Sequence, residues 1–390
     1  TLPYHDNLKS FGACFGVSAG YERPMWFALD GEKSEYEYSY NYQNWYPSAE
    51  YETNNTIKNV GLFDLTPFSK FEIKSDKAHK ELQRICTANI KDEIGKCTYT
   101  HMLNVDGGIE TDLTVVCLDQ NHFRIISSAA TRERDKFHLN KHLSKDVKLK
   151  DITDDYCVFG LFGPKSRDLI KTISKDNFDN DNFKFSTAKY ITIDGVKIWA
   201  QRLSYVGELG YELYVDINHA KKIYELLIEK GKDFNLSNCG MHAMDIMRME
   251  SGFLHWGHDI SPEENQYQAG LSFTISHKKD VEFIGKKALK KIKKEKIKSR
   301  FAMFTLKDSK PGEPLLLHDE PIYLEDKIIG RSTSGNYSFN FKKNLTFGYI
   351  NNDLSNEELK NKNLFIEVEK KKYPIFIQSE ALKRTDFKNL

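Results

Sequence analysis

The chain has 390 residues, enough for two or three packed domains, and 39% of them are apolar, as in ordinary globular proteins. Lys and Arg number 57 and Asp and Glu 56, so no global field favours nucleic acid or an anionic membrane as a partner. The sequence contains no apolar run near the roughly 18 residues that a membrane span needs. Six scattered cysteines without a C-x-x-C pair are typical of reduced thiols, so we expect a cytoplasmic protein, or one of the mitochondrial matrix in a eukaryote.

Residues 1–50 are rich in aromatic side chains and predict an irregular lead-in whose rings pack on the rest of the protein. Residues 51–285 follow as one body in which strand and helix patterns alternate. The expected strands lie in segments 60–66, 70–73, 97–128, 147–162 and 184–215, and the expected helices over 50–58, 78–87, 133–143, 163–173, 218–231 and 241–253. Strands followed by helices occur twice in this body, which predicts an α+β fold with a duplicated topology.

The Lys-rich segment 286–300 marks a boundary after this body and predicts a short linker helix with a basic face. That face is either simply solvated or attracts the polyanionic tail of a ligand. Residues 301–390 form the last expected domain, in which short strands over 301–377 separated by turns are typical of a small β-barrel or sandwich.

One candidate site lies in segment 101–116, where the pair Gly107-Gly108 predicts a tight turn with positive φ. The alternating run through Leu113 and Val115 then predicts a strand leaving the turn. Asp112 lies at the junction, where a strand can hold a carboxylate rigidly against a ligand. The alternative is a β-hairpin with a solvated acid.

A second candidate lies in segment 204–215, where two glycines bracket Glu208 in a turn before a strand. Alternation places Glu212 on the opposite face from Leu213. A carboxylate there can accept two N–H donors from a heterocycle such as an aminopyrimidinone. The alternative is a surface hairpin with ordinary acids.

The sequence lacks the motifs of several other binding and catalytic sites. The sequence has no G-x-G-x-x-G after the first strands, no P-loop and no G-x-S-x-G. The pairs His138/His142 and His255/His258 lack the further ligands of a zinc site, so we expect no metal centre.

Several ordered motifs give the chain a family resemblance. It resembles the T protein of the glycine cleavage system, a family of tetrahydrofolate-dependent aminomethyltransferases. Residues 21–27 make it more similar to the folate-binding C-terminal half of dimethylglycine and sarcosine dehydrogenases. The motifs are Val60-Gly-Leu-Phe-Asp-Leu-Thr66, Tyr99-Thr-His-Met-Leu-Asn104, Gly107-Gly-Ile-Glu-Thr-Asp-Leu-Thr-Val115, Ser204-Tyr-Val-Gly-Glu-Leu-Gly-Tyr-Glu212, Arg248-Met-Glu-Ser-Gly252, Trp256-Gly-His-Asp-Ile260 and Phe283-Ile-Gly285.

The resemblance implies a folate-binding α+β body of duplicated subdomains, closed on one side by a C-terminal β-barrel. It implies that Asp112 is the central catalytic carboxylate, close to the folate nitrogens that accept the one-carbon unit. Glu212 matches the acid that binds the pterin amino and ring N–H groups. Tyr99 and Tyr205 match tyrosines of the same pocket, and Trp256 matches an aromatic position beside it.

Two departures from the family pattern matter. T proteins often carry Ala-Arg-Asp where this chain has Ala243-Met-Asp245, so a folate contact from that Arg is not expected. The dehydrogenases also carry a flavin-binding half, and this sequence has no flavin-binding motif. Oxidation of a methylamine would therefore need a flavoprotein partner subunit or a missing N-terminal domain.

Three functions remain open from the sequence. The first is a tetrahydrofolate-dependent transferase that takes a one-carbon unit from an N-methylated amine such as dimethylglycine or sarcosine. The second is a redox-neutral transfer of a methyl group from an onium donor to tetrahydrofolate. The third is a non-catalytic regulatory subunit on the same fold. Retention of the four residues Asp112, Glu212, Tyr99 and Tyr205 favours an enzyme.

Overall fold

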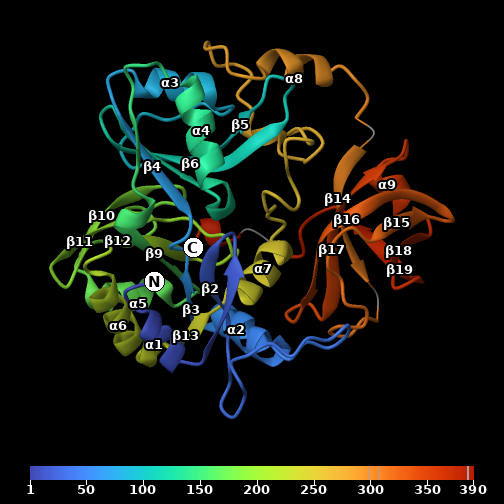
Figure 1. Ribbon diagram of the computed structural model, residues 1–390, viewed down its shortest axis with the longest axis horizontal. Helices are drawn as coiled ribbons and strands as arrows, with labels where there is room; N and C mark the ends of the chain where they lie inside the picture. Colours follow the sequence, from blue (N-terminus) through green and yellow to red (C-terminus); the bar gives the residue numbers. More distant parts are fainter. Residues whose placement is uncertain (298, 307, 384–385) are drawn as a thin grey trace.

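The computed structural model describes residues 1–297, 299–306, 308–383 and 386–390. Two β-sheets form the body of the molecule, and a closed barrel stands beside them (Figure 1). Within the described residues, no helix combines the length and the apolar character that crossing a membrane requires.

The first sheet has five antiparallel strands in the order β5-β6-β7-β4-β8. Two helices, α3 (Ala78–Ile85) and α4 (Arg132–His142), contribute Leu82 and Leu139 to the core on its outer face. The strands are β4 (Ser69–Lys74), β5 (Cys97–Leu103), β6 (Ile109–Asp119), β7 (His122–Ser127) and β8 (Leu149–Asp151).

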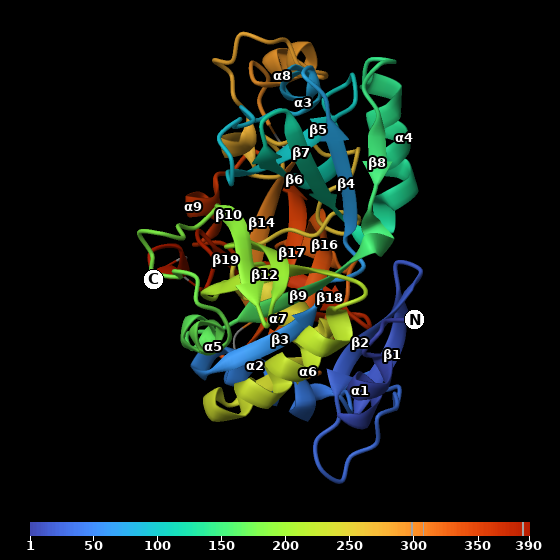
Figure 2. The same cartoon turned by 90° about the vertical axis from the view of Figure 1, so that its left-hand side faces the viewer.

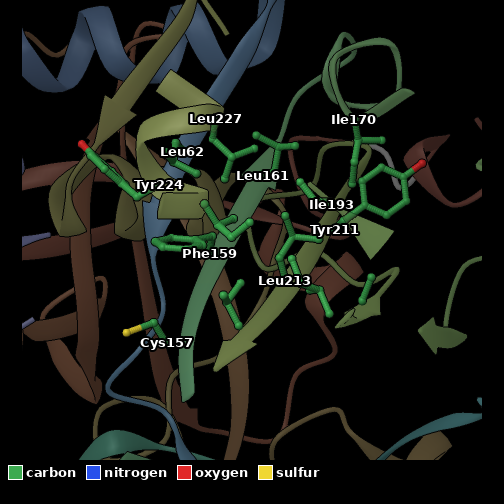
Figure 3. Packing of buried hydrophobic residues seen from close by; sticks show 14 of the residues in the cluster. Leu62, Cys157, Phe159, Leu161, Ile170, Ile193, Tyr211, Leu213, Tyr224 and Leu227 are labelled. Carbon is green, nitrogen blue, oxygen red and sulfur yellow. The ribbon is translucent and has the colours of Figure 1, made fainter. Parts of the chain in front are cut away.

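The second sheet has six strands in the order β10-β11-β12-β9-β3-β13, and β13 pairs with β3 in parallel. Helices α5 (Ser166–Ile173) and α6 (Ala220–Gly231) pack on its outer face, where leucine, isoleucine and aromatic side chains form the largest core (Figure 3). The strands are β3 (Val60–Asp64), β9 (Tyr156–Phe162), β10 (Ala188–Ile193), β11 (Val196–Gln201), β12 (Gly210–Asp216) and β13 (Leu236–Cys239).

The two sheets repeat one topology. The chain runs β4-α3-β5-β6-β7-α4-β8 and then β9-α5-β10-β11-β12-α6-β13, and in both halves the first four strands lie in the order second, third, fourth, first. The prediction of a duplicated α+β body is therefore confirmed. The halves diverge at their last strand, because β8 pairs with β4 of its own sheet whereas β13 pairs with β3.

The inner faces of both sheets share a third core. Alternation along β9 and β12 sends Phe159 and Leu213 outward, and Val158 and Tyr214 inward. Cys97 and Val116 of the first sheet join the inner core. Two further helices, α2 (Tyr46–Lys58) and α7 (Met241–Glu250), lie at one end of the second sheet (Figure 2).

The lead-in is more regular than the sequence analysis expected. Residues 1–27 form helix α1 (His5–Ser10) and the hairpin β1 (Ala13–Ser18) and β2 (Tyr21–Phe27). Positive φ values at Ala19 and Gly20 make the turn, and a bulge opposite Cys14 and Phe15 accommodates Pro24 within the strand. Pro24 thus lies where the pairing register shifts.

The C-terminal strands close into a barrel in the order β14-β17-β16-β15-β18-β19, which decides between the expected barrel and sandwich. Its strands are β14 (Ser299–Leu306), β15 (Pro321–Leu324), β16 (Lys327–Ser338), β17 (Lys343–Asn351), β18 (Leu364–Val368) and β19 (Lys371–Gln378). Helix α8 (Lys286–Ile292) precedes the barrel in the sequence, and α9 (Asn356–Leu359) lies in the connection between β17 and β18. Short 3₁₀ turns occur at Ala129–Thr131, Thr153–Asp155, Lys232–Phe234, Ser272–Thr274 and Asp386–Lys388.

Candidate functional site

The turn before β6 has the geometry that its glycine pair predicts. Gly107 has a φ of +90°, and a Cβ on Gly108 would lie 1.9 Å from the Pro262 carbonyl oxygen. The Asn104 side-chain oxygen accepts hydrogen bonds from the backbone N–H groups of Asp106 and Gly108, at 3.0 and 2.9 Å. The turn therefore fixes the start of β6, and with it the position of Asp112.

Asp112 lies on the inner face of the first sheet, directly opposite His101 on β5. The Tyr99 hydroxyl donates a hydrogen bond to Asp112 Oδ2 at 3.2 Å. Burial raises the pKa of Asp112 to about 7, and the charge of Asp135 adds to the rise while the Tyr99 hydrogen bond opposes it. Asp112 can thus hold or release a proton near neutral pH.

His101 is a residue of this site that the sequence analysis missed. Its Nε2 lies 3.3 Å from the Tyr99 hydroxyl, and its Nδ1 lies 3.1 Å from both Gln266 Nε2 and Thr274 Oγ1. The ring is fully buried, and burial lowers its pKa to about 3. A neutral His101 is therefore the second polar neighbour of the Tyr99 hydroxyl, besides Asp112. Its two-residue spacing from Tyr99 on one strand was a signal that could have identified it.

Glu212 lies on the inner face of the second sheet, as alternation with Leu213 predicts. The Tyr214 hydroxyl donates to Glu212 Oε2 at 3.0 Å. Burial raises the pKa of Glu212 to about 7, against the effect of that hydrogen bond. The guanidinium carbon of Arg124, on β7, lies 5.6 Å from the centre of the Tyr214 ring, so the two sheets meet beside Glu212.

Gln201 is the cross-strand partner of Glu212, and the sequence analysis missed it too. Its side chain is fully buried, and both its Nε2 and its Oε1 lack a hydrogen-bond partner within the described part of the chain. Alternation with the inward-facing Trp199 places Gln201 on the inner face, which is the signal that sequence reasoning could have used.

Tyr205 reaches the site from the loop between β11 and β12. Its hydroxyl donates to the Leu254 carbonyl at 3.0 Å. Burial raises the pKa of Tyr205; Arg248 counteracts the rise, and Asp112 adds to it. Burial and the charges of Asp112 and Tyr205 raise the pKa of Tyr99 in turn. The structure thus brings Asp112, Tyr99 and Tyr205 within one electrostatic environment.

Trp256 contacts the first residue of β6. Its indole N–H donates to the Ile109 carbonyl at 3.1 Å, and the Arg134 guanidinium lies 5.3 Å from its ring centre. Among the described contacts, Trp256 touches neither Asp112 nor Glu212. This hydrogen bond ties Trp256 to the strand that carries Asp112, and its expected place beside the folate pocket stays a prediction.

A buried ion-pair network joins the body to the barrel close to the site. Arg248 on α7 contacts Asp245 at 2.8 Å and Asp259 at 2.6 Å, and donates to Ser334 on β16 at 2.9 Å. Thr333 and Ser334 hydroxyls donate to the other oxygen of Asp259 at 2.6 and 2.7 Å. This network was not foreseen, because its barrel members, Thr333 and Ser334, are distant in sequence from Arg248 and Asp259. In the part of the chain that the structure describes, no three potential ligands gather as a metal site would require.

Two family models match the chain. The model described as the GCVT N-terminal domain matches residues 4–279, and that described as the glycine cleavage T-protein C-terminal barrel domain matches residues 300–382.

Individual proteins show the same relationship. The chain is 37% identical to 4-methylaminobutanoate oxidase (formaldehyde-forming) of Paenarthrobacter nicotinovorans, over 86% of this chain and 40% of that protein. It is 32% identical to mitochondrial dimethylglycine dehydrogenase of Rattus norvegicus, over 95% of this chain and 43% of that protein. The chain therefore spans about two fifths of the length of these relatives.

A solved structure shows the same fold along nearly the whole chain. The glycine cleavage system aminomethyltransferase T from Bartonella henselae matches 98% of this chain and 97% of its own, with a TM-score of 0.83 and 21% identity.

Proposed function

This chain belongs to the glycine cleavage T-protein family, and we propose that it is a tetrahydrofolate-dependent transferase that accepts a one-carbon unit from an N-methylated amine. The observation that carries the proposal is the placement of two carboxylates, Asp112 and Glu212, on the inner faces of the two sheets, each with a pKa raised by burial to about 7. Perturbed acids of this kind gather at functional sites, because a purely structural core gains nothing from them.

The inner face of the second sheet suits the ring of tetrahydrofolate. The Glu212 carboxylate, when ionised, offers acceptors to an amino group and a ring N–H. Beside it, the buried Gln201 amide has no partner among the described residues, so a hydrogen-bond donor and an acceptor are left unused there. Glu212 and Tyr205 would hold the ring, and Tyr99 would line the same space next to Asp112.

Asp112 would act on the donor side of the reaction. Bound tetrahydrofolate supplies the nitrogens that accept the one-carbon unit. Tyr99 occupies Oδ2 of Asp112, so Oδ1 is the oxygen that we assign to the reacting centre. A carboxylate there stabilises positive charge that develops on the amine, and it can take up a proton because its pKa lies near the working pH.

The relatives suggest the donor class. The names of two of them specify an oxidase acting on a methylaminobutanoate and a dehydrogenase acting on dimethylglycine. We therefore expect a secondary or tertiary methylamine as donor, with its oxidation carried out by a flavoprotein domain or partner subunit. The alternative is transfer of an intact methyl group from an onium donor, which needs no oxidant and yields 5-methyltetrahydrofolate.

The proposal is tested by calorimetric titration of the chain with tetrahydrofolate, first with the wild type and then with the Glu212→Ala variant. Micromolar binding that the variant loses supports the folate site. Methylated donors are then supplied with tetrahydrofolate, and the product is identified as the methylene or the methyl form. If the wild type does not bind tetrahydrofolate, the proposal fails and the non-catalytic regulatory function becomes the better account.

A further inference from the structure

The chain returns from the barrel to the body after β19. Leu382 packs with Met249 of α7 and Phe347 of β17. The backbone N–H of Lys383 then donates to the carbonyl of Glu250, the last residue of α7, at 2.9 Å. This short segment is therefore held against both the barrel and the body, and it brings Lys383 to a defined place at the end of α7.

The Lys383 ammonium forms a buried ion pair with Glu208, in the turn between β11 and β12. Only 16% of the Lys383 side chain and 11% of the Glu208 side chain are exposed. Burial raises the pKa of Glu208 and that of Glu250, and the charge of Lys383 opposes the rise in both. Removing the ammonium would therefore strip two enclosed carboxylates of a compensating charge.

The turn that contains Glu208 packs closely between α7 and Lys383. Gly207 has a φ of +69°, and a Cβ on it would lie 2.1 Å from Ser251 Oγ and 3.4 Å from Lys383 Cδ. The end of α7 therefore covers one side of the turn, and the stem of Lys383 lies close enough for van der Waals contact. The ion pair with Glu208 then fixes the turn in this place.

Tyr205 belongs to the same turn. Ser204 Oγ accepts hydrogen bonds from the backbone N–H groups of Val206 and Glu208, at 3.4 and 3.2 Å, so one side chain closes the turn around Tyr205. The Tyr205 hydroxyl donates to the Leu254 carbonyl at 3.0 Å. Tyr205 is therefore fixed at its hydroxyl by one contact and at its backbone by the turn.

Glu212 follows this turn but has separate supports. The Leu209 carbonyl accepts a hydrogen bond from the Gly163 backbone N–H at 2.8 Å, just before β12 begins. Within β12, Glu212 is paired with β11 on one side and with β9 on the other. Loss of the Lys383 charge should therefore loosen the turn at Tyr205 and leave Glu212 in place.

We propose that Lys383 is a positioning residue that, through Glu208, fixes the turn from which Tyr205 lines the folate site. The inference rests on the proposed folate site and goes beyond it, because it makes ligand binding depend on a residue that follows the barrel in the sequence. The physical reason is the cost of ordering. A turn that is loose in the ligand-free protein must be ordered when the ligand binds, and a turn that is already fixed avoids this cost.

The test is calorimetric titration of the full chain with tetrahydrofolate in two variants of Lys383. Lys383→Met keeps an unbranched stem and removes the charge, and it should weaken binding by about five- to tenfold. Lys383→Arg keeps a cation for Glu208, and its affinity should stay within about twofold of the wild type. Lys360→Met is the matched control, because it breaks an exposed ion pair with Glu357 on the barrel, and it should bind normally.

Double-mutant cycles identify the side chain through which Lys383 acts. Tyr205→Ala removes the ring that the turn positions, so adding Lys383→Met to it should change the dissociation constant by less than about twofold. Adding Lys383→Met to Glu212→Ala should still weaken binding by the full factor, because Glu212 has its own supports. The two cycles distinguish a residue that positions Tyr205 from one that only stabilises the protein.

Thermal unfolding of the ligand-free variants accompanies the titrations. If Lys383→Met is unfolded at the temperature of the titration, Lys383→Gln takes its place in every comparison, because its amide can still donate to Glu208.

The outcomes separate this inference from the proposal beneath it. Normal binding in the uncharged variant overturns the role of Lys383, and so does a loss that Lys383→Arg does not rescue or that adds in full to the effect of Tyr205→Ala. Each of these results leaves the folate site intact. A wild type that does not bind tetrahydrofolate overturns the proposed function itself.

Discussion

Asp112 and His101 face each other directly across β5 and β6, and the Tyr99 hydroxyl lies within 3.3 Å of both side chains. Since His101 is buried and has a pKa near 3, it stays neutral at physiological pH. When Asp112 is ionised, Tyr99 donates to it and can accept from the His101 N–H. Among the described residues, the Asp112 carboxylate is thus held by the neutral side chains of Tyr99 and His101 and not by a cation, so its proton affinity stays high.

Replacing Asp112 with Asn tests the central carboxylate. We expect one-carbon transfer to fall by about tenfold or more, because the side chain can no longer carry charge or take up a proton. Tetrahydrofolate binding, measured by calorimetry, should change little. Near-normal turnover in this variant would remove Asp112 from the mechanism.

The same variant should alter stability in a pH-dependent way. The folded pKa of Asp112 is raised above its unfolded value, so the folded state binds the proton more tightly and stability is lost as the pH rises through about 7. Asp112→Asn should therefore unfold at a higher temperature than the wild type at pH 8, with a gain on the order of 4 kcal/mol. At pH 4 the two proteins should unfold at similar temperatures. A gain of equal size at both pH values would point to a cause other than ionisation.

The two carboxylates should control the pH dependence of different kinetic constants, Asp112 that of kcat and Glu212 that of the KM for tetrahydrofolate. At saturating tetrahydrofolate, kcat should rise as the pH increases through about 7, because Asp112 must be ionised. The KM for tetrahydrofolate should fall over the same range, since ionised Glu212 accepts both N–H donors. In Asp112→Asn the rise in kcat should disappear while the change in KM persists. Loss of both together would assign the two effects to one group.

Truncation of Glu212 should weaken binding selectively. We expect Glu212→Ala to lose about 1–3 kcal/mol of tetrahydrofolate binding, the cost of leaving buried ligand donors without acceptors. Glu357→Ala, an exposed acid on the barrel, is the matched control and should bind normally. An unchanged dissociation constant in Glu212→Ala would place the ring elsewhere.

The basic helix α8 has a measurable consequence of its own. Residues of α8 contact the turn before β6, where a Cβ on Gly107 would lie 3.3 to 3.5 Å from Ile292, Ala288 and Leu289. If its lysines attract the ligand tail, polyglutamylated tetrahydrofolate should bind more tightly than the monoglutamate, and added salt should reduce the difference. Equal affinities of the two ligands at low salt would show that the lysines of α8 are only solvated and do not attract the ligand tail.

The link between body and barrel should depend on Arg248. Arg248→Met leaves Asp259 buried without its cation, so we expect a loss of about 3–5 kcal/mol in the free energy of unfolding. Arg331→Met breaks an exposed ion pair with Asp319 and should cost less than about 1 kcal/mol. Chemical denaturation of both variants makes the comparison. A small effect in Arg248→Met would mean that the barrel is held by apolar packing alone.

The sequence by itself determined the elements and the family. Alternation placed Glu212 opposite Leu213, the glycine pair predicted the turn before Asp112, and the repeated strand–helix order predicted the duplicated body, because each of these signals is local along the chain. Ordered motifs over nearly the full length identified the family.

Only the tertiary structure decided which residues meet. Pairing of β5 with β6 set His101 against Asp112, pairing of β11 with β12 set Gln201 beside Glu212, and the closed barrel brought Ser334 to Arg248. It also turned the lead-in into a hairpin. These relationships depend on strand register and long-range packing. Packing fixes the burial of each side chain, and burial raises the pKa values of Asp112 and Glu212.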